Sequence, residues 1–146
     1  MASANGHLAV VRLLLQDPQV NPAADNNSAI QGASHYGHLE VVRLLLSDPR
    51  VNPASRNNYA IRIASANGHI EVVRLLLQDP RVDPSVHNNE VIRLACMSNN
   101  LQLVKLLMQN PQVDPSVNDN ELVQWANHHN HTKMIELLLQ DPRVHL

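Results

Sequence analysis

The chain repeats itself every 31 residues. The stretch from Gly37 to Leu46 returns almost unchanged from Gly68 to Leu77. The position at which it begins is held in turn by Gly6, Gly37, Gly68, Asn99 and Asn130, a constant step of 31 residues. A fixed period of about 20–50 residues is typical of arrays in which each unit packs only against its neighbours. The sequence therefore predicts a solenoid built along a line, and not a domain with one central core.

Each unit opens with a short segment that has helical spacing. Ile30 and Ala33 are three residues apart, and the later copies keep apolar residues at both positions. An Asn stands directly before this segment, and we expect its side chain to act as an N-cap that accepts from a free backbone N–H group. These residues are Asn27, Asn58, Asn89 and Asn120. Glu90 and Glu121, which start the segment in the last two copies, suit the positive end of a helix dipole.

A second helix follows after a glycine or an asparagine. Gly37 and Gly68 suit the left-handed backbone of a helix end, and Asn99 and Asn130 are the next most tolerant choice there. The apolar stripe of the second helix follows an i, i+3, i+4 pattern. It consists of Val41, Leu44 and Leu45, with counterparts in every copy. We expect the i, i+3 pair of Glu40 and Arg43 on the solvent side of this helix.

A connector joins the second helix to the next unit. Pro49 cannot continue the helix, and Pro53 fixes an extended turn. Val51 is the only recurrent apolar residue between them, and its side chain is expected to be buried in the core. Asn57 and its counterparts favour a left-handed turn. Because proline offers no backbone donor, we expect little sheet between successive connectors.

Composition excludes several classes of function. Eleven Lys and Arg residues face 13 Asp and Glu residues, a net charge of −2 that argues against a nucleic-acid-binding face. The single cysteine, Cys96, rules out an internal disulfide and indicates a reducing compartment. The sequence contains no apolar run long enough to span a membrane and no visible signal peptide. These features predict an intracellular, cytoplasmic protein that binds no membrane.

The unit resembles an ankyrin repeat. The family pattern of Ala-Ala, Gly-His and Val-Val-x-Leu-Leu-Leu is matched by Ala33-Ser34, Gly37-His38 and residues 41–46, and is matched again in residues 64–77. The resemblance covers the whole chain as one array, with a half repeat at 1–22 and full repeats at 23–53, 54–84, 85–115 and 116–146. It implies an all-α helix-turn-helix solenoid of about four and a half repeats.

The chain departs from the family pattern in two ways. Its unit is two residues shorter than the usual 33, so we expect shortened, Pro-braced connectors in place of long β-hairpins. The family's Thr-Pro-Leu-His slot reads Ser28-Ala29-Ile30-Gln31 in the first full repeat. The family's Thr and His link neighbouring repeats, and four side chains are candidates to replace that link. They are Gln31, Arg62, Arg93 and Gln124.

The resemblance implies a non-catalytic module that binds another protein through a concave face of first helices and connector tips. A comparison of the chain's own copies agrees, because the second helix hardly changes while other positions vary. The candidate partner-binding residues are Asp25, Ser28, His35, Tyr36, Arg56, Tyr59, Arg62, Asn67, His87, Glu90, Arg93, Met97, Asn118, Glu121, His128 and His129. The alternatives are a structural or engineered scaffold with no natural ligand, and an ankyrin appendage of a larger protein.

Other residues with reactive side chains fit structural roles better. His7, His38 and His69 belong to the repeated Gly-His pair and are interpreted as structural. Cys96 replaces Ser34 and Ser65 and is expected to be a small buried residue without a triad-like setting. Trp125 is expected to fill the core of the last repeat. The group His128, His129 and His131 lacks metal-ligand spacing, so no metal site is predicted. No cofactor and no catalytic residue are predicted either.

The ends of the chain lack the polar outer helices that solenoids use as caps. Residues 2–6 match residues 64–68, so the chain opens in mid-unit, as expected for an excerpt of a longer array. Val10 and Leu14 should therefore be exposed. We expect this surface to be covered by another copy of the chain or by further repeats of a parent protein, or to be frayed. Self-association through the uncapped repeats is one of these outcomes.

Overall fold

The computed structural model describes residues 1–146, which form helices and no strand. The helices are α1 (Leu8–Gln16), α2 (Ala24–His35), α3 (Leu39–Leu46), α4 (Ser55–Ala66), α5 (Ile70–Leu76), α6 (Val86–Met97), α7 (Leu101–Met108), α8 (Val117–His128) and α9 (Thr132–Leu138). The all-α arrangement of paired helices and the strand-free connectors expected from the sequence are confirmed.

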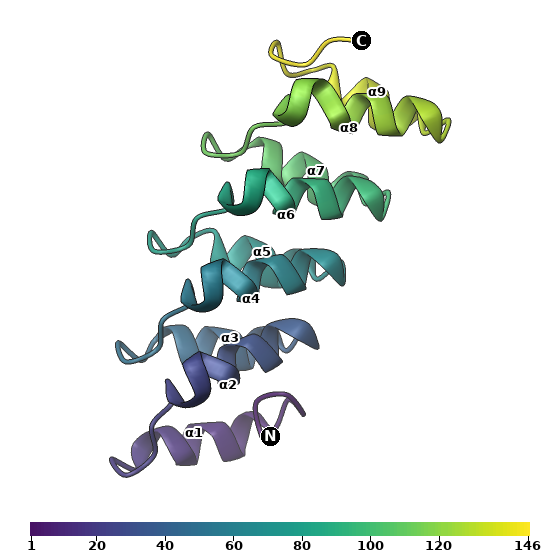
Figure 1. The fold of residues 1–146 in the computed structure, drawn as a ribbon. Helices are drawn as coiled ribbons and strands as arrows, with labels where there is room; N and C mark the ends of the chain where they lie inside the picture. Colours follow the sequence, from purple (N-terminus) through teal and green to yellow (C-terminus); the bar gives the residue numbers. More distant parts are fainter. The chain divides into compact units, whose positions relative to one another are not determined.

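The chain divides into two compact units, residues 1–83 and residues 84–146. In the first unit α2 pairs with α3 and α4 pairs with α5, while α2 packs on α4 and α3 lies between α1 and α5. In the second unit α6 pairs with α7 and α8 pairs with α9, with α6 on α8 and α7 on α9. Within each unit the connectors leave the helix pairs on the same side (Figure 1). The grouping of all repeats into one array stays a prediction.

The core of each unit is aliphatic. Ile30 and Leu45 in the first unit, and Ile92 and Leu107 in the second, are at most 1% exposed. The connector valines also reach the core, as expected. Their exposed fractions are 1% at Val51, 5% at Val82, 0% at Val113 and 6% at Val144. Each repeat therefore buries one face of its helices together with two connector residues, the valine and the proline that follows it at positions 53, 84 and 115.

A left-handed turn of three residues connects each connector to its helix. The φ angles are 51–65° at residues 25–27, 53–58° at residues 56–58, 53–54° at residues 87–89 and 52–65° at residues 118–120. The right-handed part of α2, α4, α6 or α8 follows directly. The left-handed conformation expected at Asn57 is confirmed, but it covers three residues where one was expected. Asn and Asp fill most of these positions, because their side chains tolerate this backbone best.

The asparagines that end these turns bind the connector at the far end of the same repeat. Asn27 Oδ1 accepts a hydrogen bond of 2.7 Å from the backbone N–H of Asn52. Each of the other three makes the same bond to a residue 25 positions later. The pairs are Asn58 with Asp83 at 2.8 Å, Asn89 with Asp114 at 2.8 Å, and Asn120 with His145 at 3.1 Å. The N-cap role expected for these residues is wrong, because the left-handed backbone directs each side chain to the next connector and not to its own helix.

Arginine and histidine side chains form two kinds of link between neighbouring repeats. The guanidinium of Arg81 donates hydrogen bonds to both carboxylate oxygens of Asp79 and to the carbonyl of Val51, the last at 2.9 Å. Arg50 and Arg143 make equivalent bonds to Val20 and Val113. The imidazole Nε2 of His38 lies 2.9 Å from the carbonyl oxygen of Ala4, and that of His69 lies 2.9 Å from the carbonyl oxygen of His35. The structural role expected for His38 and His69 is confirmed.

The repeated Gly-His pair works across two repeats. Gly37 has a φ of 73°, and a Cβ atom there would lie 2.6 Å from the Nδ1 atom of His69. Glycine is therefore required both for the left-handed helix end and for the space that the next imidazole fills. In the second unit Asn99 and Asn130 adopt φ values of 53° and 57°, which confirms their expected conformation. Asn99 has a Cβ atom, and no hydrogen bond joins His131 to the carbonyl of Met97 as the pattern of the first unit would require.

Candidate functional site

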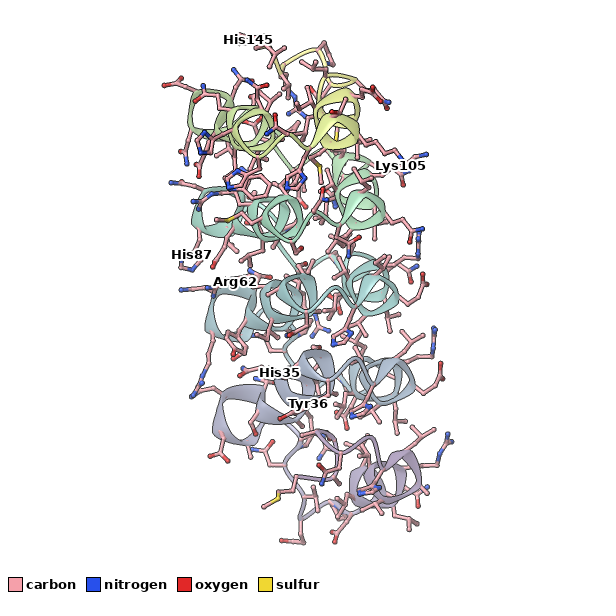
Figure 2. All side chains as sticks on the ribbon, turned by 90° about the vertical axis from the view of Figure 1, so that its right-hand side faces the viewer. His35, Tyr36, Arg62, His87, Lys105 and His145 are labelled. Atoms are coloured by element: carbon pink, nitrogen blue, oxygen red, sulfur yellow. The ribbon has the colours of Figure 1, made fainter.

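We use the term variable surface for the sixteen residues, named above as partner-binding candidates, at which the copies differ. None of the sixteen is fully buried. The first residue of each left-handed turn belongs to it: Asp25 and Arg56 in the first unit, His87 and Asn118 in the second. All four are exposed. Figure 2 shows His87 and Lys105, a residue of α7, on opposite sides of the second unit.

The first residues of the right-handed segments lie next to the turns. Ser28 is exposed and Tyr59 is half-buried in the first unit. In the second unit Asn118 donates a hydrogen bond of 2.6 Å to Glu121, and the Arg93 guanidinium donates one of 3.2 Å to the same carboxylate. The bond from Asn118, followed by the contact with Arg93, holds the pKa of Glu121 below its usual range although partial burial opposes the shift. Glu121 thus carries a negative charge at neutral pH on the variable surface.

The four polar side chains in the family's Thr-Pro-Leu-His slot behave differently from one another. Gln31 donates to the carbonyl of Asn26 at 2.6 Å, and Gln124 donates to the carbonyl of Asp119 at 2.8 Å. Both bonds stay within one repeat, so the expected link between repeats is wrong at these positions. The reason is that the left-handed turn leaves its carbonyl groups pointing at the glutamine amides. Arg93 does link two repeats, through Glu121.

The ends of the first helices carry aromatic side chains in the first unit. Tyr36 is 59% exposed, and its ring centroid lies 4.5 Å from that of His35 and 6.2 Å from that of His38. Figure 2 places His35 and Tyr36 side by side at this end of α2. Asn67, one repeat later, is exposed and donates to the carbonyl of Ile63. An exposed tyrosine beside two imidazoles is the kind of side chain that is enriched at protein interfaces.

The corresponding end in the second unit contains a cluster of rings. The ring of Trp125 is stacked 4.3 Å from that of His129 and lies 5.2 Å from that of His131. Trp125 is half-buried, so the core-filling role expected for it is wrong; it packs against the histidines at the surface. His128 is exposed, and Met97, at the equivalent position one repeat earlier, is 56% exposed.

The opposite side of the first unit is constant and self-paired. Glu40 and Arg43 lie 3.6 Å apart, and Glu71 and Arg74 lie 3.4 Å apart, with all four side chains at least half exposed. The solvent-facing pairs expected from the sequence are confirmed. Exposed i, i+3 pairs of this kind stabilise a helix only slightly, so this surface offers a partner charges that are already balanced.

Helix α1 exposes an apolar surface at the N-terminal end of the first unit. Val10 is 47% exposed, Leu13 67% and Leu14 42%, although the equivalents of Val10 and Leu14 in α3 are buried. Behind them lies an apolar hollow of about 150 Å³ between residues 1–3 and α1, closed by Leu45. The exposure expected for Val10 and Leu14 is confirmed.

The single thiol of the chain lies in the core of the second unit and not on the variable surface. The Cys96 thiol is fully buried, as expected, and desolvation raises its pKa to about 12, so it is not a nucleophile at neutral pH. No three His, Cys, Asp or Glu side chains are grouped so that they could hold a metal ion. None of the helices is sufficiently long and apolar to cross a membrane.

Sequence reasoning missed the long-range partners of two sets of residues. Asn27, Asn58, Asn89 and Asn120 were recognised by their position but given the wrong partner. The arginines of the Asp-Pro-Arg motif at 48–50, 79–81 and 141–143 received no role. Their signal was available, because both sets recur at the 31-residue period with little change.

Comparison with known protein families gives one match. The family model described as ankyrin repeats (3 copies) matches residues 1–88 and residues 61–145. A comparison with curated proteins finds no match.

Proposed function

The chain belongs to the ankyrin repeat family, and we propose that it binds another protein through its variable surface. Ankyrin repeats generally form protein-binding modules. The finer assignment to the connector tips and the exposed face of the first helices rests on this chain's own side chains. The proposed role is non-catalytic and needs no cofactor.

One observation carries the proposal. All sixteen residues of the variable surface are exposed or half-buried, whereas the constant helix positions of the same repeats are buried or paired with one another. Ile61 and Val73 are fully buried, and Arg74 is paired with Glu71. Arg56, in the same repeat, is exposed and held by nothing but its backbone. A partner can therefore be accommodated at Arg56 without any change to the core.

Rigidity of the turns supports the same role. In the first unit the carbonyl of Asn26 accepts from Gln31 and also from the hydroxyl of Ser55 at 2.8 Å. The bond from Asn52 to Asn27 holds the other end of the turn. A surface fixed in this way before binding loses little conformational entropy when a partner docks.

A pull-down with two matched variants tests the proposal. The first variant replaces Tyr36, Arg56, Tyr59 and Arg62 by Ala, and the second replaces Glu40, Arg43, Glu71 and Arg74 by Ala. We expect proteins retained by the wild-type chain to be lost from the first variant and kept by the second. Circular dichroism checks that both variants are folded. Equal retention by the two variants contradicts the proposal.

A further inference from the structure

We propose that Arg56 binds a carboxylate group of the partner protein, so that the partner presents an Asp, a Glu or its C-terminus to the connector tip at residues 54–58. This inference rests on the proposed function and names the chemistry of the group that the surface recognises. It concerns the first unit only.

The backbone at Arg56 is the first reason. Its φ and ψ are 53° and 48°, in the left-handed region that L-residues other than Asn and Asp rarely adopt. Asn or Asp fills every other position of the four left-handed turns except His87, and His is also a residue that this region favours. Arginine is thus the one residue that the turn geometry does not explain. A residue that occupies a backbone conformation unfavourable to it supports the inference that its side chain has a function.

The guanidinium of Arg56 is the second reason. Four other arginines of the first unit have carboxylate partners: Arg50 with Asp48, Arg81 with Asp79, and the helix pairs Arg43 with Glu40 and Arg74 with Glu71. Arg56 is exposed and makes no hydrogen bond or ion pair. Arg12 on α1 is also without a partner, but it lies in a right-handed helix that suits arginine. Only Arg56 combines an unfavourable backbone with an unused charge.

The side chain fits one kind of group. A guanidinium offers a planar fork of donors that matches the two oxygens of a carboxylate. The equivalent position one repeat earlier holds Asp25, which repels a carboxylate. The two turns therefore distinguish an acidic group placed at the repeat of Arg56 from the same group placed one repeat earlier. Discrimination by opposite charges at neighbouring positions is a common source of specificity at interfaces.

Peptide display on the full chain tests the inference. A library of random 12-residue peptides is selected against the wild-type protein, and the selected peptides are then synthesised for titration. The variants are Arg56→Asn, which keeps the turn, Arg56→Lys, which keeps the charge without the fork, and Arg12→Gln, which removes an equally unpaired charge elsewhere. A variant with Tyr36, Tyr59 and Arg62 replaced by Ala reports on the variable surface independently.

We expect the selected peptides to share an acidic group, whose change to an amide weakens binding about tenfold. Arg56→Asn should weaken binding of the unmodified acidic peptide to the same extent as the amide change. It should not weaken binding of the amide peptide further, and it should raise the urea midpoint of unfolding. The affinity of Arg56→Lys for the acidic peptide should lie between those of wild type and Arg56→Asn, and Arg12→Gln should bind the peptide like wild type. The inference is overturned if no acidic peptide is selected, or if the losses from Arg56→Asn and from the amide change simply add. If the triple-Ala variant also binds like wild type, the proposed function fails as well.

Discussion

At the scale of single residues, the chain separates side chains that stabilise the fold of a repeat from side chains that a partner can contact. Asn58 and Arg56 show the difference within one turn. Both have left-handed backbones, but Asn58 is 6% exposed and bound to Asp83, whereas Arg56 is exposed and unbound. Their different roles follow from where each side chain points and not from local sequence.

The bond made by Asn58 should stabilise the fold measurably. Asn58→Gly keeps the left-handed backbone but removes the acceptor of the Asp83 N–H, at a cost of about 1–3 kcal/mol. Asn57→Gly is a matched control, because Asn57 has a φ of 54° and its side chain makes no hydrogen bond. Urea unfolding of both variants measures the difference. Equal losses of stability for the two variants would show that the bond contributes nothing.

The packing of Gly37 against His69 gives a second prediction. Gly37→Ala introduces a Cβ atom 2.6 Å from the imidazole and also strains a backbone with a φ of 73°. In a His69→Ala background only the strain remains, about 1–2 kcal/mol. We therefore expect the substitution to cost more in the wild-type chain than in the His69→Ala chain. Thermal or urea unfolding of the four proteins measures both costs, and identical costs contradict the contact.

At the scale of elements, the connector is held by charge as well as by proline. The hydrogen bond from Arg81 keeps the pKa of Asp79 below its ordinary value of 3.8, although partial desolvation opposes the shift. The folded state therefore binds this proton less readily than the unfolded state. The resulting stability is present above about pH 4 and is lost as the pH falls through the lowered pKa.

Removing this bond should make the free energy of unfolding depend less on pH in the acid range. Asp79→Asn and Arg81→Gln each break the same bond, so both variants should be less stable than the wild-type chain at neutral pH. As the pH falls below about 4, the free energy of unfolding of both variants should decrease less than that of the wild-type chain. Urea midpoints measured from pH 2.5 to pH 7 report the curve. Parallel curves for wild type and both variants are the opposing result.

Helix α1 should be the least protected element of the first unit. It packs on α3 from one side only, and Leu13 is 67% exposed. Few buried contacts leave a helix open to local unfolding. We expect α1 amides to exchange with solvent faster than α3 amides, unless a second copy covers this surface. A monomer by light scattering with α1 amides protected as strongly as those of α3 would contradict this account.

Periodicity predicted the helices well because their signals are local. Ile30 and Ala33 mark a helix by spacing alone, and Gly37 marks its end by backbone preference. The long-range hydrogen bonds could not be assigned in the same way, because Asn27 and its partner Asn52 are 25 residues apart and meet only after the two helices between them have folded. Trp125 was misplaced for a related reason. Its ring packs against the rings of His129 and His131, and no other repeat has a histidine at both of these positions.

At the scale of the whole molecule, two compact units carry the same design with different exposed residues. The first presents Asp25, Arg56 and Tyr36, and the second presents His87, Met97 and a surface cluster around Trp125. Both are covered by the ankyrin family model, whose two overlapping matches at residues 1–88 and 61–145 each include residues of both units. The single-array organisation, the cytoplasmic location and possible self-association at the ends stay predictions. The identity of binding residues rests on the contrast between constant and varying positions.

Hydrogen exchange of the chain, free and bound to a captured partner, tests that contrast most directly. The account predicts that binding protects amides in the left-handed turns and at both ends of the first helices, around residues 25–28, 56–59 and 35–36 in the first unit or their equivalents in the second. It predicts no change along the solvent side of α3 and α5, where Glu40, Arg43, Glu71 and Arg74 lie. Protection confined to that paired side, with the turns unchanged, would contradict the central claim that the varying residues form the binding surface.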